Sequence, residues 1–290
     1  MRYVIEQDSV LVLPHPVREH HCELRLMPAD GPVQRVHAAH LETEPPAPLG
    51  SHIDYFGNIV HHCDIVASHT ELITRLRVEV DTLLSNPFDY ALLSPAVERA
   101  WLANALKSQP TLWDYVLHRS ERTPDLTKLN GEALDWPRYD PERMLLDSVH
   151  RAREWIGETL TYKPGEPHAN LDAVLAAGTG TAVDYAHLFV ALVRSWQCAA
   201  RYVRGYVDPT NFDDEDQAAV PHAWAEVLIP GAGWRGFDPT TGLVVNDTYI
   251  AVAVGRDSFD VPLQRSTFKG EEQPTVPEVS LRVSREAAQQ

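Results

Sequence analysis

Residues 178–196 read Gly178-Thr-Gly-Thr-Ala-Val-Asp-Tyr-Ala-His-Leu-Phe-Val-Ala-Leu-Val-Arg-Ser-Trp196. The glycines and threonines at the start of this stretch are typical of a turn followed by a helix cap. From Leu188 to Val193 the stretch is apolar all round, which a helix tolerates only when it is buried on every side. The stretch therefore predicts a buried helix that begins near Thr181.

The start of such a helix favours a particular chemistry. Its unpaired amides and partial positive charge lower the pKa of a thiol and stabilise a developing oxyanion. A nucleophile is expected at this place, but the residue there is Ala182.

A second stretch, residues 221–240, reads Pro221-His-Ala-Trp-Ala-Glu-Val-Leu-Ile-Pro-Gly-Ala-Gly-Trp-Arg-Gly-Phe-Asp-Pro-Thr240. Its two halves are typical of strands joined by a turn at Pro230-Gly-Ala-Gly, and folding them as an antiparallel hairpin brings His222 close to Asp238. In a triad of nucleophile, histidine and carboxylate, the carboxylate fixes the imidazole tautomer while the other ring nitrogen faces the nucleophile. The sequence thus predicts two of the three members of such a triad, the histidine and the carboxylate.

Outside these two stretches, the pattern of polar and apolar residues divides the chain into an N-terminal β domain, a core and a tail. Alternating polar and apolar residues from Tyr3 to about Leu83 predict an antiparallel β domain over residues 1–85. Helices are expected over residues 95–106 and 141–160, each started by a proline, within a core that covers residues 86–270. The acidic residues 211–217 predict an exposed loop. Residues 271–290 are polar with scattered prolines, and we expect a loosely held tail.

The composition excludes several classes of protein. Forty-one acidic residues against 25 basic ones give a formal net charge of -16, which disfavours nucleic acid and anionic lipid as partners. No run of 18 apolar residues and no secretory leader is evident, so we expect no membrane span and a cytoplasmic location. Cys22, Cys63 and Cys198 are too few and too widely spaced for a disulfide framework or a cysteine-rich zinc site.

Several separated motifs resemble one family. They are Gly180-Thr-Ala-Val-Asp-Tyr-Ala-His, Ala200-Arg-Tyr-Val-Arg-Gly-Tyr, His222-Ala-Trp-Ala-Glu-Val, Gly233-Trp-Arg-Gly-Phe-Asp-Pro-Thr and Val254-Gly-Arg-Asp-Ser-Phe-Asp-Val-Pro, preceded by Asp54-Tyr-Phe-Gly-Asn. Together they resemble the bacterial transglutaminase-like superfamily, relatives of papain-fold cysteine proteases. The resemblance implies an α+β fold in which an antiparallel β domain precedes a papain-like core with a central buried helix packed on an antiparallel sheet.

The resemblance also assigns roles. It implies a cysteine at position 182 that attacks an amide carbonyl, His222 as the base that activates it and Asp238 as the residue that orients His222. Ala182 departs from this pattern, since alanine cannot form a thioester. The retained His222, Asp238 and glycines favour a constructed change that disarms the enzyme, whereas Val183, where the family commonly has glutamine, is typical of an inherited loss.

The resulting hypothesis is a cysteine-type peptide or amide hydrolase, or a transglutaminase, inactive as it stands and without a cofactor or metal. Its partner would be a peptide or protein amide, and Trp224 and Trp234 are candidates to line the substrate groove. A pseudoenzyme that binds a peptide without cleaving it is the alternative, and a metallohydrolase built on the 14 histidines is a third possibility. His61-His-Cys-Asp64 is an unpromising metal site, because alternate strand residues point to opposite faces.

Overall fold

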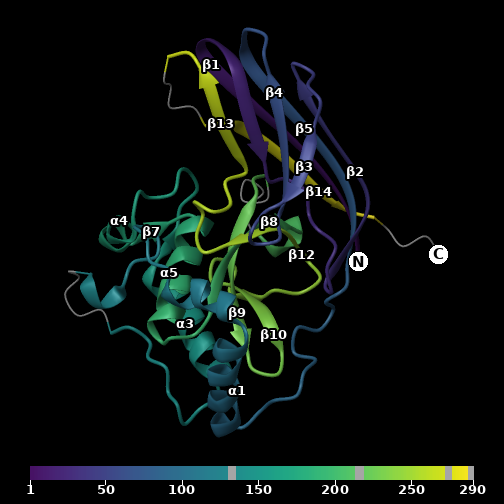
Figure 1. Cartoon of the computed structure of the whole chain (residues 1–290). Helices are drawn as coiled ribbons and strands as arrows, with labels where there is room; N and C mark the ends of the chain where they lie inside the picture. The colour runs from purple at the N-terminus through teal and green to yellow at the C-terminus, as the bar shows by residue number, and fades with distance from the viewer. Residues whose placement is uncertain (130–134, 213–218, 272–275, 287–290) are drawn as a thin grey trace.

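The computed structural model describes residues 1–129, 135–212, 219–271 and 276–286 of the 290 residues. Two antiparallel sheets lie one above the other in Figure 1, and helices cover the lower sheet. This is the predicted α+β fold, with an N-terminal β region and a helix-containing core.

The first sheet is built around the long strand β1. Its strand order is β2-β5-β1-β4-β3, and β13 and β14 also pair with β1. The strands are β1 (Arg2–Leu24), β2 (Gln34–Glu44), β3 (Gly50–Ile53), β4 (Ile59–Ile65), β5 (His69–Thr82), β13 (Gln264–Lys269) and β14 (Glu278–Arg285). Buried and exposed residues alternate along the first half of β1, as a sheet with one wet face requires.

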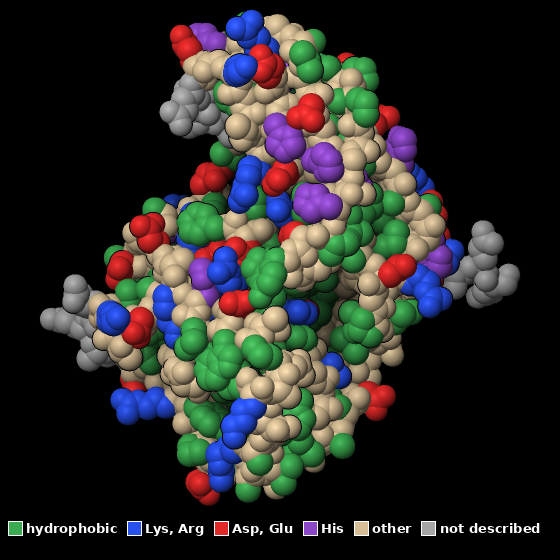
Figure 2. All heavy atoms as spheres, in the orientation of Figure 1, with side chains coloured by type: hydrophobic (Ala, Val, Ile, Leu, Met, Phe, Trp, Pro, Cys, Tyr) green, Lys and Arg blue, Asp and Glu red, His purple; other side chains and the backbone are tan. Residues whose placement is uncertain are grey.

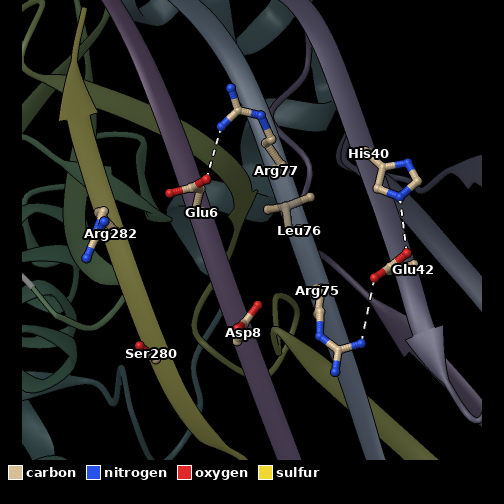
Figure 3. Close-up of a pocket in the computed structure, with 9 residues that line it drawn as sticks. All are labelled: Glu6, Asp8, His40, Glu42, Arg75, Leu76, Arg77, Ser280 and Arg282. Atoms are coloured by element: carbon tan, nitrogen blue, oxygen red, sulfur yellow. Dashed lines mark hydrogen bonds and ion pairs between the residues drawn. The ribbon is translucent and has the colours of Figure 1, made fainter.

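The wet face of this sheet carries charged side chains in rows. A hollow of about 410 Å³ opens there between β1, β2, β5 and β14 (Figure 3). Arg77 pairs with Glu6 at 3.0 Å, and Arg75 pairs with Glu44 at 3.1 Å. Arg75 and Arg77 are therefore held by carboxylates on neighbouring strands.

Helices fill the middle of the chain. They are α1 (Pro95–Ser108), α2 (Asp114–Leu117), α3 (Leu145–Thr159), α4 (Leu171–Ala177) and α5 (Ala182–Ser195), with 3-10 turns at Pro110–Trp113, Leu126–Lys128 and Pro209–Asn211. The first helix begins at Pro95 as expected. The third begins at Leu145 and not at Pro141, because Asp140 makes a turn by accepting the Glu142 amide and buried Glu98 caps the Leu145 amide at 2.7 Å.

The second sheet supports α5. Its order is β11-β10-β9-β8-β12, with β8 (Ala200–Val207), β9 (His222–Ile229), β10 (Gly233–Asp238), β11 (Leu243–Val244) and β12 (Tyr249–Gly255). Two further short strands, β6 (Thr161–Tyr162) and β7 (Thr179–Gly180), pair in parallel. Helix α5 packs against β8 and β9 and is buried from Ala182 to Arg194, which confirms the prediction of a central buried helix.

The two sheets are joined along β12. The side-chain amide of Gln34 donates to the Ala251 carbonyl at 2.8 Å and accepts the Ala251 backbone N–H at 2.9 Å. The side-chain amide of Asn58 does the same with Val254, at 2.8 and 2.7 Å. These amides satisfy the free backbone groups of an edge strand, which would otherwise be open to pairing with another chain.

The expected loose tail is wrong for residues 278–285. They form β14, which pairs with β1 from Tyr3↔Arg285 to Val10↔Glu278. Strand β13 lies before residue 270 yet also pairs with β1, so the domain boundaries at residues 85 and 270 stay a prediction. Most of the predicted loop over 211–217 lies outside the described residues. Among the described helices, none combines the length and apolar character needed to span a membrane, and the cytoplasmic location stays a prediction.

Candidate active site

His222 and Asp238 meet as the hairpin predicted. Strands β9 and β10 pair antiparallel from Gly233↔Ile229 to Phe237↔Ala225, and Nε2 of His222 lies 2.8 Å from Oδ2 of Asp238. The two side chains are 4% and 0% exposed. A carboxylate only accepts hydrogen bonds, so Nε2 of His222 donates and Nδ1 is the ring nitrogen left to face another group.

Asp238 is held ionised by a complete set of donors. Its Oδ2 accepts the hydroxyls of Tyr249 and Thr241, each at 2.9 Å, and its Oδ1 accepts the Thr240 amide at 2.9 Å. Burial alone would raise the pKa of Asp238, but the charge of His222 and the hydrogen bonds from His222, Tyr249 and Thr241 together lower it. A stable negative charge therefore stands behind the imidazole.

Tyr249 and Thr241 were missed by the sequence analysis. Thr241 follows the Asp-Pro turn, so its closeness to Asp238 had a local signal. Tyr249 lies on β12, beyond β8 and β9 in the sheet order, and nothing near it in the sequence points to Asp238. Burial raises the pKa of Tyr249 and nearby Asp238 raises it further, so its hydroxyl stays a donor.

Helix α5 begins at Ala182, directly after the cap residue Thr181. The Asp184 carboxylate accepts the Thr181 amide at 2.9 Å and the Thr181 hydroxyl at 3.0 Å. It also accepts the His168 amide at 3.1 Å. Asp184 therefore closes the helix start.

Ala182 has the setting expected of a nucleophile position. It is the first residue of α5, 9% exposed, where helix geometry leaves backbone amides without an intrahelical partner. Its side chain belongs to the same buried cluster as Ala223, the neighbour of His222. The structure thus brings the start of α5 and the start of β9 to one core.

The two tryptophans differ. Trp224 is 1% exposed and packs edge-on against Tyr249 with ring centroids 5.3 Å apart. Its predicted place in a substrate groove is wrong, because its ring is buried in a cluster with Tyr249 and Val203. Trp234 is half-buried, with the Arg201 guanidinium 4.3 Å from its ring centroid, and its groove role stays a prediction.

Histidines gather elsewhere, on the first sheet. Figure 2 shows several of them on the surface of the first sheet, where the His62 ring lies 6.4 Å from that of His21 and 5.7 Å from that of His52. Over the described ranges, no group of three or more His, Cys, Asp or Glu side chains could hold a metal ion. Cys22, Cys63 and Cys198 are free and buried.

The fold and the site define a class: an α+β protein with a transglutaminase-like core. Its buried helix packs on β9, whose His222 bonds Asp238 of the neighbouring strand β10. Comparison with known proteins bears on this class. Residues 138–239 match the transglutaminase-like superfamily, and residues 3–81 match the bacterial transglutaminase-like N-terminal region.

Relatives extend the match over most of the chain. An uncharacterised protein of Mycobacterium leprae is 30% identical over 255 residues, 86% of this chain and 86% of its own length. One of Mycobacterium tuberculosis H37Rv is 30% identical over 273 residues, 89% of this chain and 84% of its own length. The chain belongs to the transglutaminase-like superfamily.

One solved structure shares the whole fold. A candidate cysteine protease from Cytophaga hutchinsonii aligns with a TM-score of 0.73 and 18% identity, over 98% of this chain and 90% of that one. At this identity the likeness concerns the fold alone: the solved structure has the same arrangement of the two sheets and the helices.

Proposed function

We propose that this chain carries the acyl-transfer site of a cysteine-type peptide or amide hydrolase, with Ala182 in place of the nucleophile. The observation that carries the proposal is the buried hydrogen bond between His222 of β9 and Asp238 of β10, in the sheet on which α5 packs. Membership of the transglutaminase-like superfamily supports it.

With a thiol at position 182, His222 would act as the base. Asp238 holds Nε2 of the ring, so Nδ1 takes the proton of the thiol and the resulting imidazolium is stabilised by the carboxylate. The thiolate attacks an amide carbonyl, the amine leaves with a proton from His222, and a thioester remains. Water then releases the acid product and frees the thiol.

The backbone at the helix start would meet the oxyanion. The amide of residue 182 lies at the positive end of α5, where negative charge is favoured. No side chain of the described residues marks a dedicated amine site, and hydrolysis is the proposed outcome rather than amine transfer.

As it stands, the chain forms no thioester, because a methyl group cannot attack a carbonyl. Ala182 itself therefore favours a second function, the binding of a peptide or protein amide without cleavage. Restoring the thiol separates the two.

The first prediction concerns Ala182→Cys. The new thiol should react with iodoacetamide at pH 6 about tenfold faster than a free cysteine, because the helix start and His222 lower its pKa. Rates are followed by mass spectrometry, with the unchanged chain as the background for the three native cysteines. Release of acid and amine from amide substrates would then establish turnover.

Two matched variants give the controls. Ala96→Cys places a thiol in the exposed first turn of α1, which has a helix dipole but no histidine–carboxylate pair. His222→Ala in the Ala182→Cys chain should slow alkylation to the rate of Ala96→Cys. If Ala182→Cys itself reacts no faster than Ala96→Cys, the enzyme proposal is wrong and the binding function stands.

A further inference from the structure

A second polar group includes Arg204 on β8 and His187 on α5, the helix that begins at Ala182. Arg204 pairs directly with Ala223, and the next pair along is Gly205↔His222. Opposed residues of antiparallel strands have Cα atoms about 5 Å apart, so the Arg204 backbone lies beside the start of β9. His187 follows Ala182 on α5 by five residues, roughly 7.5 Å along the helix axis.

This group holds buried hydrogen-bond donors without acceptors. Among the described residues, Nε and Nη1 of Arg122, Nε of Arg204 and Nδ1 of His187 are buried and have no hydrogen-bond partner. Nε2 of His187 accepts the Ser258 amide at 3.1 Å, so the proton of the neutral ring is on Nδ1. Orphaned buried donors are rare in native proteins and call for an acceptor.

The donors belong to one cluster. The ring of fully buried Tyr202 stacks on that of His187, with centroids 4.9 Å apart. Burial lowers the pKa of His187 to about 3; the charges of Arg122 and Arg204 lower it too, while Asp257 opposes them. His187 thus stays a neutral donor within electrostatic range of two cations. The Arg122 guanidinium lies 5.6 Å from the centroid of the exposed Phe259 ring, so the cluster reaches the surface.

The two guanidiniums also lack the counter-charges that neighbouring arginines have. Arg201 pairs with Glu226 at 2.6 Å, and Arg256 pairs with Asp260 at 2.8 Å. Within the described part of the chain, neither Arg122 nor Arg204 has such a partner. The buried Asp257 carboxylate acts on His187, but its oxygens are engaged by the His118 ring at 2.9 Å and the Phe259 amide at 2.9 Å. In a protein of formal charge -16, two half-buried arginines without an ion-pair partner favour an anion from outside.

We propose that Arg122, Arg204 and His187 form a subsite beside position 182 that binds a carboxylate of the peptide substrate. This inference rests on the proposed function for the identity of the ligand as a peptide. Guanidinium forks match the planar carboxylate in a bidentate way, and the imidazole N–H adds a third donor. The carboxylate is supplied by an acidic side chain or by the end of the peptide.

The test uses the unchanged chain, which cannot cleave what it binds. The immobilised protein is incubated with degenerate hexapeptides in which every amino acid except cysteine is represented, as C-terminal amides in one arm and as free acids in the other. The retained peptides are identified by mass spectrometry. We expect about tenfold enrichment of Asp and Glu over Asn and Gln at one position of the amides, or of free acids over amides.

Matched variants assign the effect. Arg204→Met and Arg122→Met should each abolish the enrichment, whereas Arg282→Met, which removes the same charge from the exposed face of β14, should leave it intact. Arg204→Gln, which keeps a donor, serves if Arg204→Met does not fold. Three results would overturn the subsite. They are retention of peptides without a preference for carboxylates, enrichment that persists in the Arg204 and Arg122 variants, and no retained peptide at all.

Failure of the subsite is distinguishable from failure of the enzyme proposal. Peptide retention needs no thiol, and alkylation of Ala182→Cys needs no carboxylate. If the Ala182→Cys thiol is unreactive but peptides are retained in an Arg204-dependent way, the subsite is supported in a protein that only binds. If the thiol is reactive but no Arg204-dependent retention is seen, the nucleophile site is supported without the subsite.

Discussion

Asp238 shows how a single buried charge is kept ionised. An isolated carboxylate in an apolar setting would take up a proton. Here the hydroxyls of Tyr249 and Thr241 and the amide of Thr240 surround it, and His222 completes the set. The same bonds that stabilise the charge also fix the direction in which the imidazole points.

A Tyr249→Phe variant tests this arrangement. It should lower the free energy of unfolding by about 2 kcal/mol, because a hydrogen bond to a buried charge is lost. Tyr55→Phe is the matched control, since the Tyr55 hydroxyl also bonds an aspartate, Asp114 at 2.6 Å, but Tyr55 is 70% exposed. Its change should stay within about 0.5 kcal/mol. Chemical denaturation measures both, and equal changes would contradict the central role of Tyr249.

At the scale of elements, β1 connects the ends of the chain. Its first half lies between β5 and β14, and its second half between β4 and β13. Without β14, the first half of β1 would be an open edge, ready to pair with another chain. The segment that looks like a polar tail therefore completes the sheet.

Neighbouring residues of β14 offer the test. Leu281 is 9% exposed and belongs to the main core, whereas Arg282 is exposed. Leu281→Ala should cost about 2–3 kcal/mol of unfolding free energy, since a core leucine is truncated, and Arg282→Ala should change it by less than about 0.5 kcal/mol. A loosely held tail would instead show no difference between the two variants in thermal denaturation.

At the scale of the whole molecule, buried histidines make the fold sensitive to acid. His20 of the first sheet and His187 of α5 are 0% and 1% exposed. Burial lowers the pKa of His20 to about 4, with added effects of His69 and His21, and lowers that of His187 to about 3. Below pH 6.5 the unfolded chain binds protons at both positions while the folded chain does not, so stability falls as the pH falls.

The unfolding free energy should therefore drop between pH 6.5 and about 4 by about 1.4 kcal/mol per pH unit for each of these histidines. The double variant His20→Gln, His187→Gln should lose most of this slope. Urea denaturation at pH 7, 6 and 5 compares the slopes of the two chains. Parallel slopes would show that other groups control the acid response.

The sequence by itself determined what local patterns specify. The apolar run after Thr181 predicted α5, and the Pro230 turn predicted the hairpin that joins His222 to Asp238. These features act over a few turns or one hairpin, where caps, periodicity and turn residues are sufficient. Only the tertiary structure decided the rest: Tyr249 on Asp238, β14 on β1, and Arg122 and Arg204 within electrostatic range of His187. Each of these joins segments far apart in the chain, and the period of a strand or helix fixes which face is buried but not which distant partner covers it.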